Sequence, residues 1–551
     1  MFPKRILFLI VAVLLTECLS AQEQFAFRIS FTDKAGSPPV SNPLSFLSQR
    51  AIDRRAKFGL SPDGTDQPVS PLYLDTVLDL TEGKLHMTSR WLNHCVVLLD
   101  DSSKILTLQG KTYINAIQYI AYYPGGLHIA SGGQSGNNPV KTRLKTTADP
   151  AWYGSAWPQT SLVRGECLHD LGLKGAGQII AVLDDGFLFV NTAPGFDSVY
   201  QSGRIIDKHN FVLADPLVYG YGSHGTQILS TMAGNIPGGY VGAAPDASYA
   251  LYITEDILSE QSIEMDNFIA ATERADSLGA DVLTSSLGYN FFSFPSVNLT
   301  YPEIDGKTTV AARAVNFASA KGLLCVITAG NEGGNAWNFI LTPGDADSAL
   351  TVGSVDNSKN VASNSGYGPN AAGRTKPEIC VQGAPAMVLS SGANPYAVNG
   401  TSVATPQAAG YAACLLQAQP ARNPSQLRNA IVRSSHLYNT PDNHAGHGVP
   451  DFCAALSLLD VPETEPAISG LTVTPNPFDT DIRLSFYNPG ESDAVLIIYD
   501  ITGKVVNESK VRLKKGTNLL TVKMPEALSP GFYTGRLSSG SHSASFKLLR
   551  K

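Results

Sequence analysis

Residues 22–148 show the patterns of a small α+β domain. Residues 25–31, FAFRISF, largely alternate apolar and polar positions as a half-buried strand does, and the apolar run CVVLL at residues 95–99 indicates a second strand. Residues 48–57 and 71–80 carry helical patterns, and the first of these is basic. The stretch GGQSGNNP at residues 132–139 then has the composition of a linker.

The pattern changes over residues 149–460, where buried strands alternate with helices. Strands that are apolar on both faces need helices on both sides, so this domain is predicted to be α/β, with a parallel sheet covered on both faces. The apolar runs lie at residues 178–183, 247–253, 282–287 and 323–329, and the helical patterns lie at residues 224–233, 263–278, 307–321 and 404–417.

The last part of the chain, residues 461–551, has almost no helical pattern. It begins with the linker PETEP at residues 462–466. The apolar strand VLIIY at residues 495–499 is followed by a turn at residues 502–503 and a second strand at residues 504–506. Short strands with turns at this spacing predict a β-sandwich.

Residues 1–21 have the order of a secretory signal peptide. Lys4 and Arg5 precede an apolar run at residues 6–15, and the small-residue site LSA follows at residues 19–21. The run is too short to span a bilayer, and a buried helix is the alternative. Glu17 stands before Cys18 where a lipidation signal would have a small residue, which argues against lipidation.

Composition and charge restrict the classes of function that are open to the chain. The chain has 551 residues and a net charge of −7, without a long basic run, which argues against nucleic acid as a partner. Export permits disulfides, but the spacing of the cysteines beyond the signal peptide does not show which of them pair. Cys325 and Cys414 lie in apolar runs and are predicted to be buried thiols.

Three polar stretches of the middle domain fall at strand ends or helix starts. The sequence NGTSVATP at residues 399–406 places Ser402 between a glycine turn and a helical run, with Pro406 expected in the first turn of that helix. The sequence DDG at residues 184–186 follows a buried strand, and GSHGT at residues 222–226 opens a helix. Taken singly, these are ordinary helix caps and turn residues.

Taken together, a carboxylate, a histidine and a serine at the carboxyl ends of parallel strands fit nucleophilic catalysis. A serine attacks only when a neutral imidazole takes its proton, and a carboxylate holds that imidazole in the correct tautomer. Asn331, in TAGNEG at residues 328–333, adds an amide donor for an oxyanion. The order Asp, His, Asn, Ser and the lack of a Gly-x-Ser-x-Gly motif at Ser402 argue against an α/β-hydrolase.

The middle domain resembles the subtilisin-like serine proteases, the subtilases. The resemblance implies that Ser402 is the nucleophile, His224 the general base and Asp184 the residue that orients the base. It also implies that Asn331 and the Ser402 N–H stabilise the oxyanion. The matching segments stand in the family's order and are AVLDDG at residues 181–186, HGT at 224–226, GAAP at 242–245, SSLG at 285–288, AGN at 329–331 and NGTSVATP at 399–406.

The resemblance also implies a substrate-binding strand. Ser286, Leu287 and Gly288 match the family segment that pairs with an extended substrate and walls the specificity pocket; an ordinary buried strand turn is the alternative. Residues 289–304 form a long aromatic stretch that we expect near the substrate cleft.

The chain departs from the family at one position of the motifs. The family usually has Ser or Thr where Asp185 stands, which leaves a choice of carboxylate; the Asp-x-Gly spacing favours Asp184. A second acid beside the triad should perturb the histidine pKa. Subtilases often bind calcium in loops, but no clear acidic ligand set stands out in this sequence.

The flanking units carry resemblances of their own. Residues 22–148 resemble a subtilase prodomain by position and by strand and helix content, which implies a folding aid and inhibitor that is cut off near residues 141–148; a retained N-terminal domain is the alternative. Residues 461–551 resemble the C-terminal sorting domain of the type IX secretion system, and an adhesion module is the alternative. The matching segments are TPNPF at residues 474–478, DITGKVV at 500–506, GFY at 531–533 and the basic end KLLRK at 547–551.

The sequence therefore predicts a serine endopeptidase that is secreted or exported to the cell surface. It should need no cofactor for its reaction, although the resemblance suggests bound calcium. The expected partners are polypeptide substrates, its own prodomain as an inhibitor and the type IX secretion machinery. The alternative is a catalytically silent cell-surface binding protein on a subtilase scaffold.

Overall fold

The computed structural model describes residues 23–126, 149–460 and 469–551, apart from residues 489–490, 526 and 540–541. The chain forms two compact units that divide between Asp460 and Val461. The predicted signal peptide, both predicted linkers and the expected cut at residues 141–148 lie outside the described residues. Among the described helices, none combines the length and apolarity that crossing a membrane requires.

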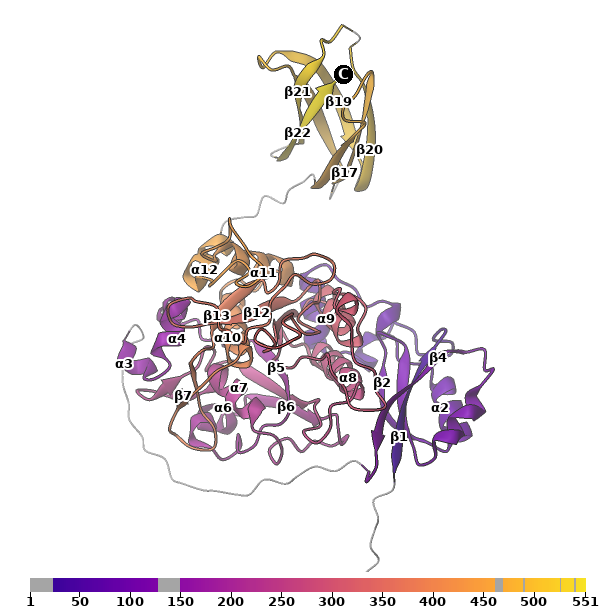
Figure 1. Ribbon diagram of the computed structural model, residues 1–551, viewed down its shortest axis with the longest axis vertical. Coiled ribbons are helices and arrows are strands. Elements are labelled where there is room, and N and C mark those ends of the chain that lie inside the picture. The colour runs from indigo at the N-terminus through magenta and orange to yellow at the C-terminus, as the bar shows by residue number, and fades with distance from the viewer. Residues whose placement is uncertain (1–22, 127–148, 461–468, 489–490, 526, 540–541) are drawn as a thin grey trace, which may run out of the picture. The chain divides into compact units, whose positions relative to one another are not determined.

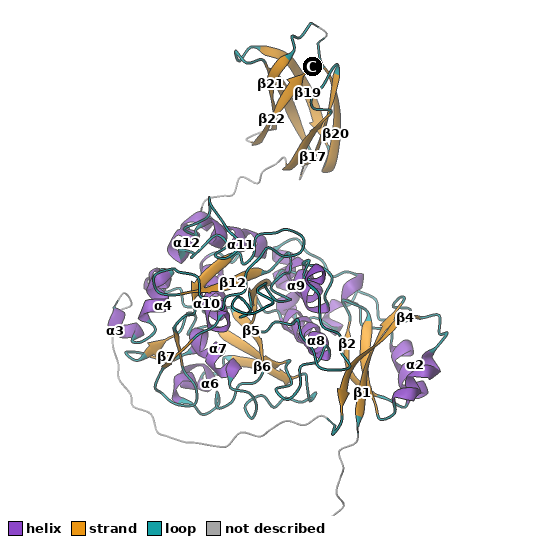
Figure 2. Ribbon diagram, in the orientation of Figure 1, coloured by secondary structure: helices purple, strands orange, loops and turns teal. Residues whose placement is uncertain are grey.

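A seven-stranded parallel sheet forms the centre of residues 149–460, called the central domain here (Figures 1 and 2). The strand order is β13-β12-β11-β10-β5-β9-β6, so the sheet extends from β5 in both directions and ligands should bind at the carboxyl ends of the strands near β5. The strands are β5 (Ile179–Asp184), β6 (Ile205–Asn210), β9 (Ser248–Ile253), β10 (Val282–Ser285), β11 (Leu324–Thr328), β12 (Leu350–Val355) and β13 (Ile379–Gln382).

Helices cover both faces of this sheet, which confirms the predicted fold class. In β5, Ile180 and Val182 are buried with residues of α7 and α10, whereas Ala181 and Leu183 are buried with residues of α8 and α9. The helices are α3 (Pro150–Tyr153), α4 (Trp157–Leu162), α5 (Gly165–Asp170), α6 (Asp197–Gln201), α7 (His224–Ala233), α8 (Ile263–Leu278), α9 (Val310–Ala320), α10 (Thr401–Ala418), α11 (Pro424–Arg433) and α12 (Phe452–Asp460).

Short elements complete the first unit. Two antiparallel pairs lie outside the main sheet, β7 (Asn235–Ile236) with β8 (Tyr240–Val241) and β14 (Ala386–Val388) with β15 (Tyr396–Val398). The 3-10 helices are η1 (Pro43–Ser45), η2 (Gly64–Asp66), η3 (Ser102–Leu108), η4 (Pro194–Phe196) and η5 (Tyr301–Glu303).

Residues 23–126, called the N-terminal domain here, form an antiparallel sheet with two helices. Both faces of this sheet are buried: Val97 and Leu99 pack in a cluster with Val77 of α2, while Val96 and Leu98 share a cluster with residues of α8 and α9. The strand order is β2-β3-β1-β4, and the elements are β1 (Gln24–Phe31), β2 (Lys84–Ser89), β3 (His94–Leu99), β4 (Ile114–Tyr123), α1 (Gln49–Lys57) and α2 (Pro71–Thr81).

Arginines of the N-terminal domain pair with buried acids on α8. Arg54 and Arg55 each place an Nη2 atom 2.5 Å from an Asp276 carboxylate oxygen, and Arg28 Nε donates to Asp266 Oδ1 at 2.7 Å. Both aspartates are fully buried. Because a buried charge that loses its partner costs several kcal/mol, these pairs bind the N-terminal domain specifically to α8.

The second unit is made of two antiparallel sheets, as the predicted β-sandwich requires. One sheet has the order β16-β17-β20 and the other β19-β18-β21-β22. Alternate residues of β17, such as Ile482, Leu484 and Phe486, are buried in the core. The strands are β16 (Ser469–Thr474), β17 (Asp481–Asn488), β18 (Ser492–Tyr499), β19 (Val505–Leu513), β20 (Gly516–Lys523), β21 (Gly531–Ser539) and β22 (His542–Arg550).

One disulfide joins residues that are 286 positions apart, Cys167 of α5 and Cys453 of α12. The sequence could not show this pairing, because distant helices bring the two thiols together. Cys325 and Cys414 are free and buried, which confirms their prediction.

Candidate active site

The carboxyl end of β5 carries a buried carboxylate. Asp184 is the last residue of β5 and is fully buried. Its backbone oxygen accepts a hydrogen bond from Thr254 N at 3.1 Å, which ties the end of β5 to the end of β9. The Oδ1 atom accepts from the N–H of Asp185 at 2.9 Å, so the carboxylate is held in one orientation.

The first residue of α7 meets this carboxylate. His224 Nδ1 lies 2.7 Å from Asp184 Oδ1, so in the neutral ring Nδ1 carries the proton and Nε2 is left as an acceptor. Gly225 allows the start of α7 to approach the chain that follows β5, since a Cβ atom at Gly225 would lie 2.4 Å from the Gly186 carbonyl oxygen. The structure therefore selects Asp184, as the spacing predicted, over Asp185 as the partner of the histidine.

The neighbouring acids change the titration of the site. Burial alone would lower the pKa of His224, but the carboxylates of Asp184, Asp185 and Glu255 outweigh it and raise that pKa to about 9. Burial, together with the Asp184 carboxylate, raises the pKa of Asp185 to about 7. The predicted effect of a second acid on the histidine is confirmed.

Ser402 lies inside the first turn of α10, not before the helix as expected. The helix begins at Thr401, because the Thr401 N–H is satisfied by Asn331 Oδ1 at 2.9 Å. Pro406 consequently falls in the second turn, and its predicted place in the first turn is wrong. Within the described residues the Ser402 N–H has no acceptor, so it remains available at the positive end of α10.

Asn331 follows β11 and is fixed through one atom of its amide. Its Oδ1 accepts from Thr401 N, from Thr401 Oγ1 at 3.1 Å and from Asn364 Nδ2 at 3.3 Å. Thr328 Oγ1 in turn donates to Thr401 Oγ1 at 2.7 Å. Since these donors identify Oδ1, the Nδ2 group is oriented away from them, and among residues 23–126 and 149–460 it meets no acceptor.

The predicted substrate strand, Ser286, Leu287 and Gly288, lies just beyond the end of β10. Ser286 Oγ donates to the Ser402 carbonyl oxygen at 2.8 Å, and Ser402 Oγ lies 3.5 Å from the Ser286 carbonyl oxygen. A Cβ atom at Gly288 would lie 2.7 Å from the Leu341 side chain, so a larger residue does not fit there. Among the described residues, no hydrogen bond joins Ser402 Oγ to His224; such bonds often tighten only with substrate bound.

The aromatic stretch that follows is partly solvent-exposed. Tyr289 is buried and donates to Glu255 Oε1 at 2.7 Å, whereas Phe294 and Val297 are 81% and 82% exposed. Ser296 Oγ donates to the Ile120 carbonyl oxygen of the N-terminal domain at 2.7 Å. Large exposed apolar side chains are typical of a binding surface, whereas the contact of Ser296 places this part of the stretch against the N-terminal domain; its predicted place near the substrate cleft stays a prediction.

One group of acids in the described chain, apart from Asp184, Asp185 and His224, could approach a metal ion. The carboxylates of Glu255, Glu260 and Glu264 lie within 4.8 Å of one another. However, Glu264 accepts hydrogen bonds on both oxygens from backbone N–H groups, and burial raises the pKa of Glu255 to about 8. Backbone N–H groups already occupy both oxygens of Glu264, so these carboxylates are not assigned as a calcium site and calcium remains a prediction.

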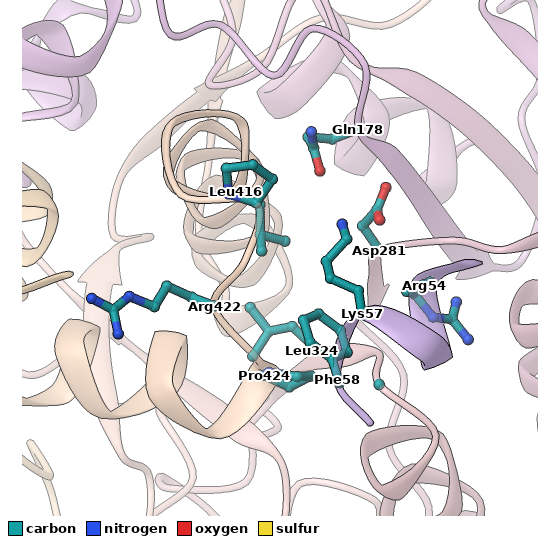
Figure 3. A pocket seen from close by; sticks show the side chains of 11 residues that line it. Arg54, Lys57, Phe58, Gln178, Asp281, Leu324, Leu416, Arg422 and Pro424 are labelled. Carbon is teal, nitrogen blue, oxygen red and sulfur yellow. The ribbon is translucent and has the colours of Figure 1, made fainter. Parts of the chain in front are cut away.

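A small cavity lies at the opposite edge of the sheet (Figure 3). Its volume is about 10 Å³, room for about one water molecule. Lys57 and Phe58 line it from the N-terminal domain, and Gln178 and Asp281 line it where β5 and β10 begin. It is therefore remote from Asp184 and is not part of the candidate site.

Two neighbours of the site received no role from the sequence. Thr401 belongs to the matching motif NGTSVATP, and its position next to Ser402 could have indicated that it has a role in the site. Glu255 follows β9 in a stretch without a recognisable motif, and only the parallel pairing of β9 with β5 brings it towards His224.

Family models match three stretches of the chain. The subtilase family matches residues 175–448, a peptidase S8 propeptide domain of Bacteroidota matches residues 26–129, and a secretion system C-terminal sorting domain matches residues 472–551. These matches confirm the three resemblances seen in the sequence.

Curated relatives agree with the match to the subtilase family. Subtilisin Savinase from Lederbergia lenta is 31% identical over 281 residues, 51% of this chain and 89% of that relative. An alkaline protease from Alkalihalobacillus alcalophilus is also 31% identical over 281 residues, but this chain spans 63% of its length and the match covers 51% of this chain. A crystal structure of MycP1 with its N-terminal propeptide removed is 23% identical, covers 56% of this chain and 98% of its own, and has a TM-score of 0.43.

Proposed function

Since the chain belongs to the subtilase family, we propose that it is a serine endopeptidase that hydrolyses peptide bonds through an acyl-enzyme. The observation that carries the proposal is the 2.7 Å hydrogen bond between His224 Nδ1 and the buried Asp184 carboxylate, at the edge of the sheet where α10 presents Ser402. A serine and a histidine oriented by a carboxylate form the machinery of acyl transfer.

In the proposed reaction, His224 acts as base and then as acid. Its Nε2 takes the proton of Ser402 Oγ as that oxygen attacks the scissile carbonyl carbon. The Asp184 carboxylate keeps the proton on Nδ1 and stabilises the imidazolium that forms. The same imidazolium then protonates the leaving amine, and a water molecule repeats the sequence to release the acyl group from Ser402.

The developing oxyanion needs donors that are already in place. The Ser402 N–H, at the start of α10, and Asn331 Nδ2 are the two candidates. Because Thr401 holds Asn331 Oδ1, the amide does not need to reorganise when charge develops, which is the condition for strong electrostatic stabilisation. All reacting groups belong to the chain, so the proposed chemistry calls for no cofactor.

The proposed substrates are extended polypeptides. We propose that residues 286–288, just beyond β10, bind the substrate by strand addition, and that the N-terminal domain inhibits the site until it is cut away. The C-terminal sorting domain indicates export, to the cell surface or beyond it, through the type IX secretion machinery.

Cleavage of a peptide library tests the proposed activity. The mature wild-type protein and the variant Ser358→Ala, which changes an exposed serine, should cleave the same peptides, while Ser402→Ala should cleave none. If the wild type cleaves no peptide and binds peptides as well as Ser402→Ala does, the protein is a catalytically silent binding protein instead.

Maturation provides a further prediction. Ser402→Ala should block removal of residues 22–148, because the site would then be unable to cut its own chain. Immunoblots of exported protein measure this removal. Normal processing of the variant would mean that another protease makes the cut.

A further inference from the structure

The nucleophile's own carbonyl group has lost its ordinary helical partner. In an α-helix each backbone C=O accepts a hydrogen bond from the N–H four residues later. Within α10 the residue four positions after Ser402 is Pro406, which has no N–H. The proline ring also crowds this carbonyl, so the Ser402 C=O must turn towards another donor.

A side chain that lies just beyond the end of β10 supplies that donor. Ser286 Oγ donates to the Ser402 carbonyl oxygen at 2.8 Å. Ser286 is 7% exposed and follows β10 directly, so the sheet fixes its backbone and water has little access to its hydroxyl. An isolated buried carbonyl would be costly, and this hydrogen bond therefore fixes the backbone of Ser402.

The same residue also lies against the reacting atom. Ser402 Oγ is 3.5 Å from the Ser286 carbonyl oxygen. Ser286 thus contacts Ser402 twice, once at the backbone and once at the side chain.

We propose that Ser286 is a positioning residue, whose hydroxyl replaces the helical N–H missing at Pro406 and so holds Ser402 in line for attack. This inference rests on the proposed function, because it takes Ser402 to be the nucleophile. It gives Ser286 a role beyond the substrate strand predicted from its sequence. The role depends on the side-chain hydroxyl, whereas strand addition to substrate uses the backbone alone.

A double-mutant cycle separates this role from a direct contact with substrate. The variant Pro406→Ala supplies the missing N–H, so the Ser402 carbonyl can be satisfied within α10. Ser286→Ala should lower kcat by roughly 10- to 100-fold in the wild-type background, since small displacements of a reacting group have effects of this size. In the Pro406→Ala background the same substitution should lower kcat by less than about 3-fold.

The measurements are kcat and KM on a peptide and the rate of labelling of Ser402 by a fluorophosphonate, all on preparations of the mature protein. KM should change by less than about 2-fold, because in the proposed role the hydroxyl binds the Ser402 carbonyl and not the substrate. Ser286→Thr, which keeps the hydroxyl, should retain most of the labelling rate. This conservative variant also provides a readout if Ser286→Ala folds poorly.

Two results would overturn the inference. One is an equal loss of kcat on Ser286→Ala in both backgrounds, and the other is a loss confined to KM. In either case the wild type is active and the proposed function stands. If the wild type itself neither cleaves peptide nor takes label, the proposed function fails, which is a different result.

Discussion

Raising the pH from 7 to 10 should increase kcat/KM of the mature protein by about 90-fold. The base must be neutral to take a proton from Ser402, and the pKa of His224 is raised to about 9. With that pKa about 1% of the imidazole is neutral at pH 7 and about 90% at pH 10, and the ratio of these fractions is the expected gain.

The assay is kcat/KM on one uncharged peptide ester or amide across pH 6–11, at constant ionic strength. The control is Asp185→Asn. Asp185, with a pKa of about 7, is ionised over the range in which His224 titrates, and its charge raises the histidine pKa. The variant's profile should therefore rise at lower pH than that of the wild type. A wild-type profile that is flat above pH 8 would refute the reasoning about these acids.

The raised pKa of His224 also affects the stability of the fold, which should fall with rising pH while the activity increases. The pKa of His224 in the folded protein, about 9, lies above its ordinary value of 6.5. Its contribution to folding is therefore complete below pH 6.5 and is lost as the pH rises through 9. The pH range that favours activity is thus one in which this site stabilises the fold less.

Three further substitutions test particular contacts. Asn331→Ala should lower kcat by about 100- to 1000-fold with little change in KM; this magnitude is the one measured for the oxyanion donor of subtilisin, a relative of this chain, and is not worked from this structure. Replacing Cys167 and Cys453 by serine should lower Tm by about 3–8 °C in calorimetry without changing kcat, since a disulfide closing so long a loop contributes about 2–5 kcal/mol. Lys376→Met should cost about 1–3 kcal/mol in denaturant unfolding, because it removes the ion pair of the buried Lys376 Nζ with Glu378 Oε1, 2.8 Å away, while Arg428 still pairs with Glu378; equal stability of variant and wild type would contradict this ion-pair argument.

The sequence predicts most of the fold because its patterns are local and strong. The helices at His224–Ala233 and Ile263–Leu278 have the predicted bounds, and the four predicted central strands form within two residues of expectation. The start of α10 was missed, since its first turn depends on the hydrogen bond from the Thr401 N–H to Asn331, a residue 70 positions away.

The site was predictable in its residue types but not in its contacts. The motifs nominate Asp184, His224 and Ser402, whereas the choice of Asp184 as the partner of His224 becomes explicit only in the 2.7 Å hydrogen bond. The hydrogen bond between Ser286 and Ser402 joins two motifs 116 residues apart, and no local pattern reports such a contact. Predicted roles in substrate binding and calcium binding stay predictions.

Labelling of the mature protein with a fluorophosphonate tests the central claim most directly. The account predicts one label per molecule, located by peptide mapping on Ser402, and complete loss of labelling in His224→Ala. A protein that takes no label, or that is labelled at another serine, would contradict the assignment of Ser402 as the nucleophile of a serine protease.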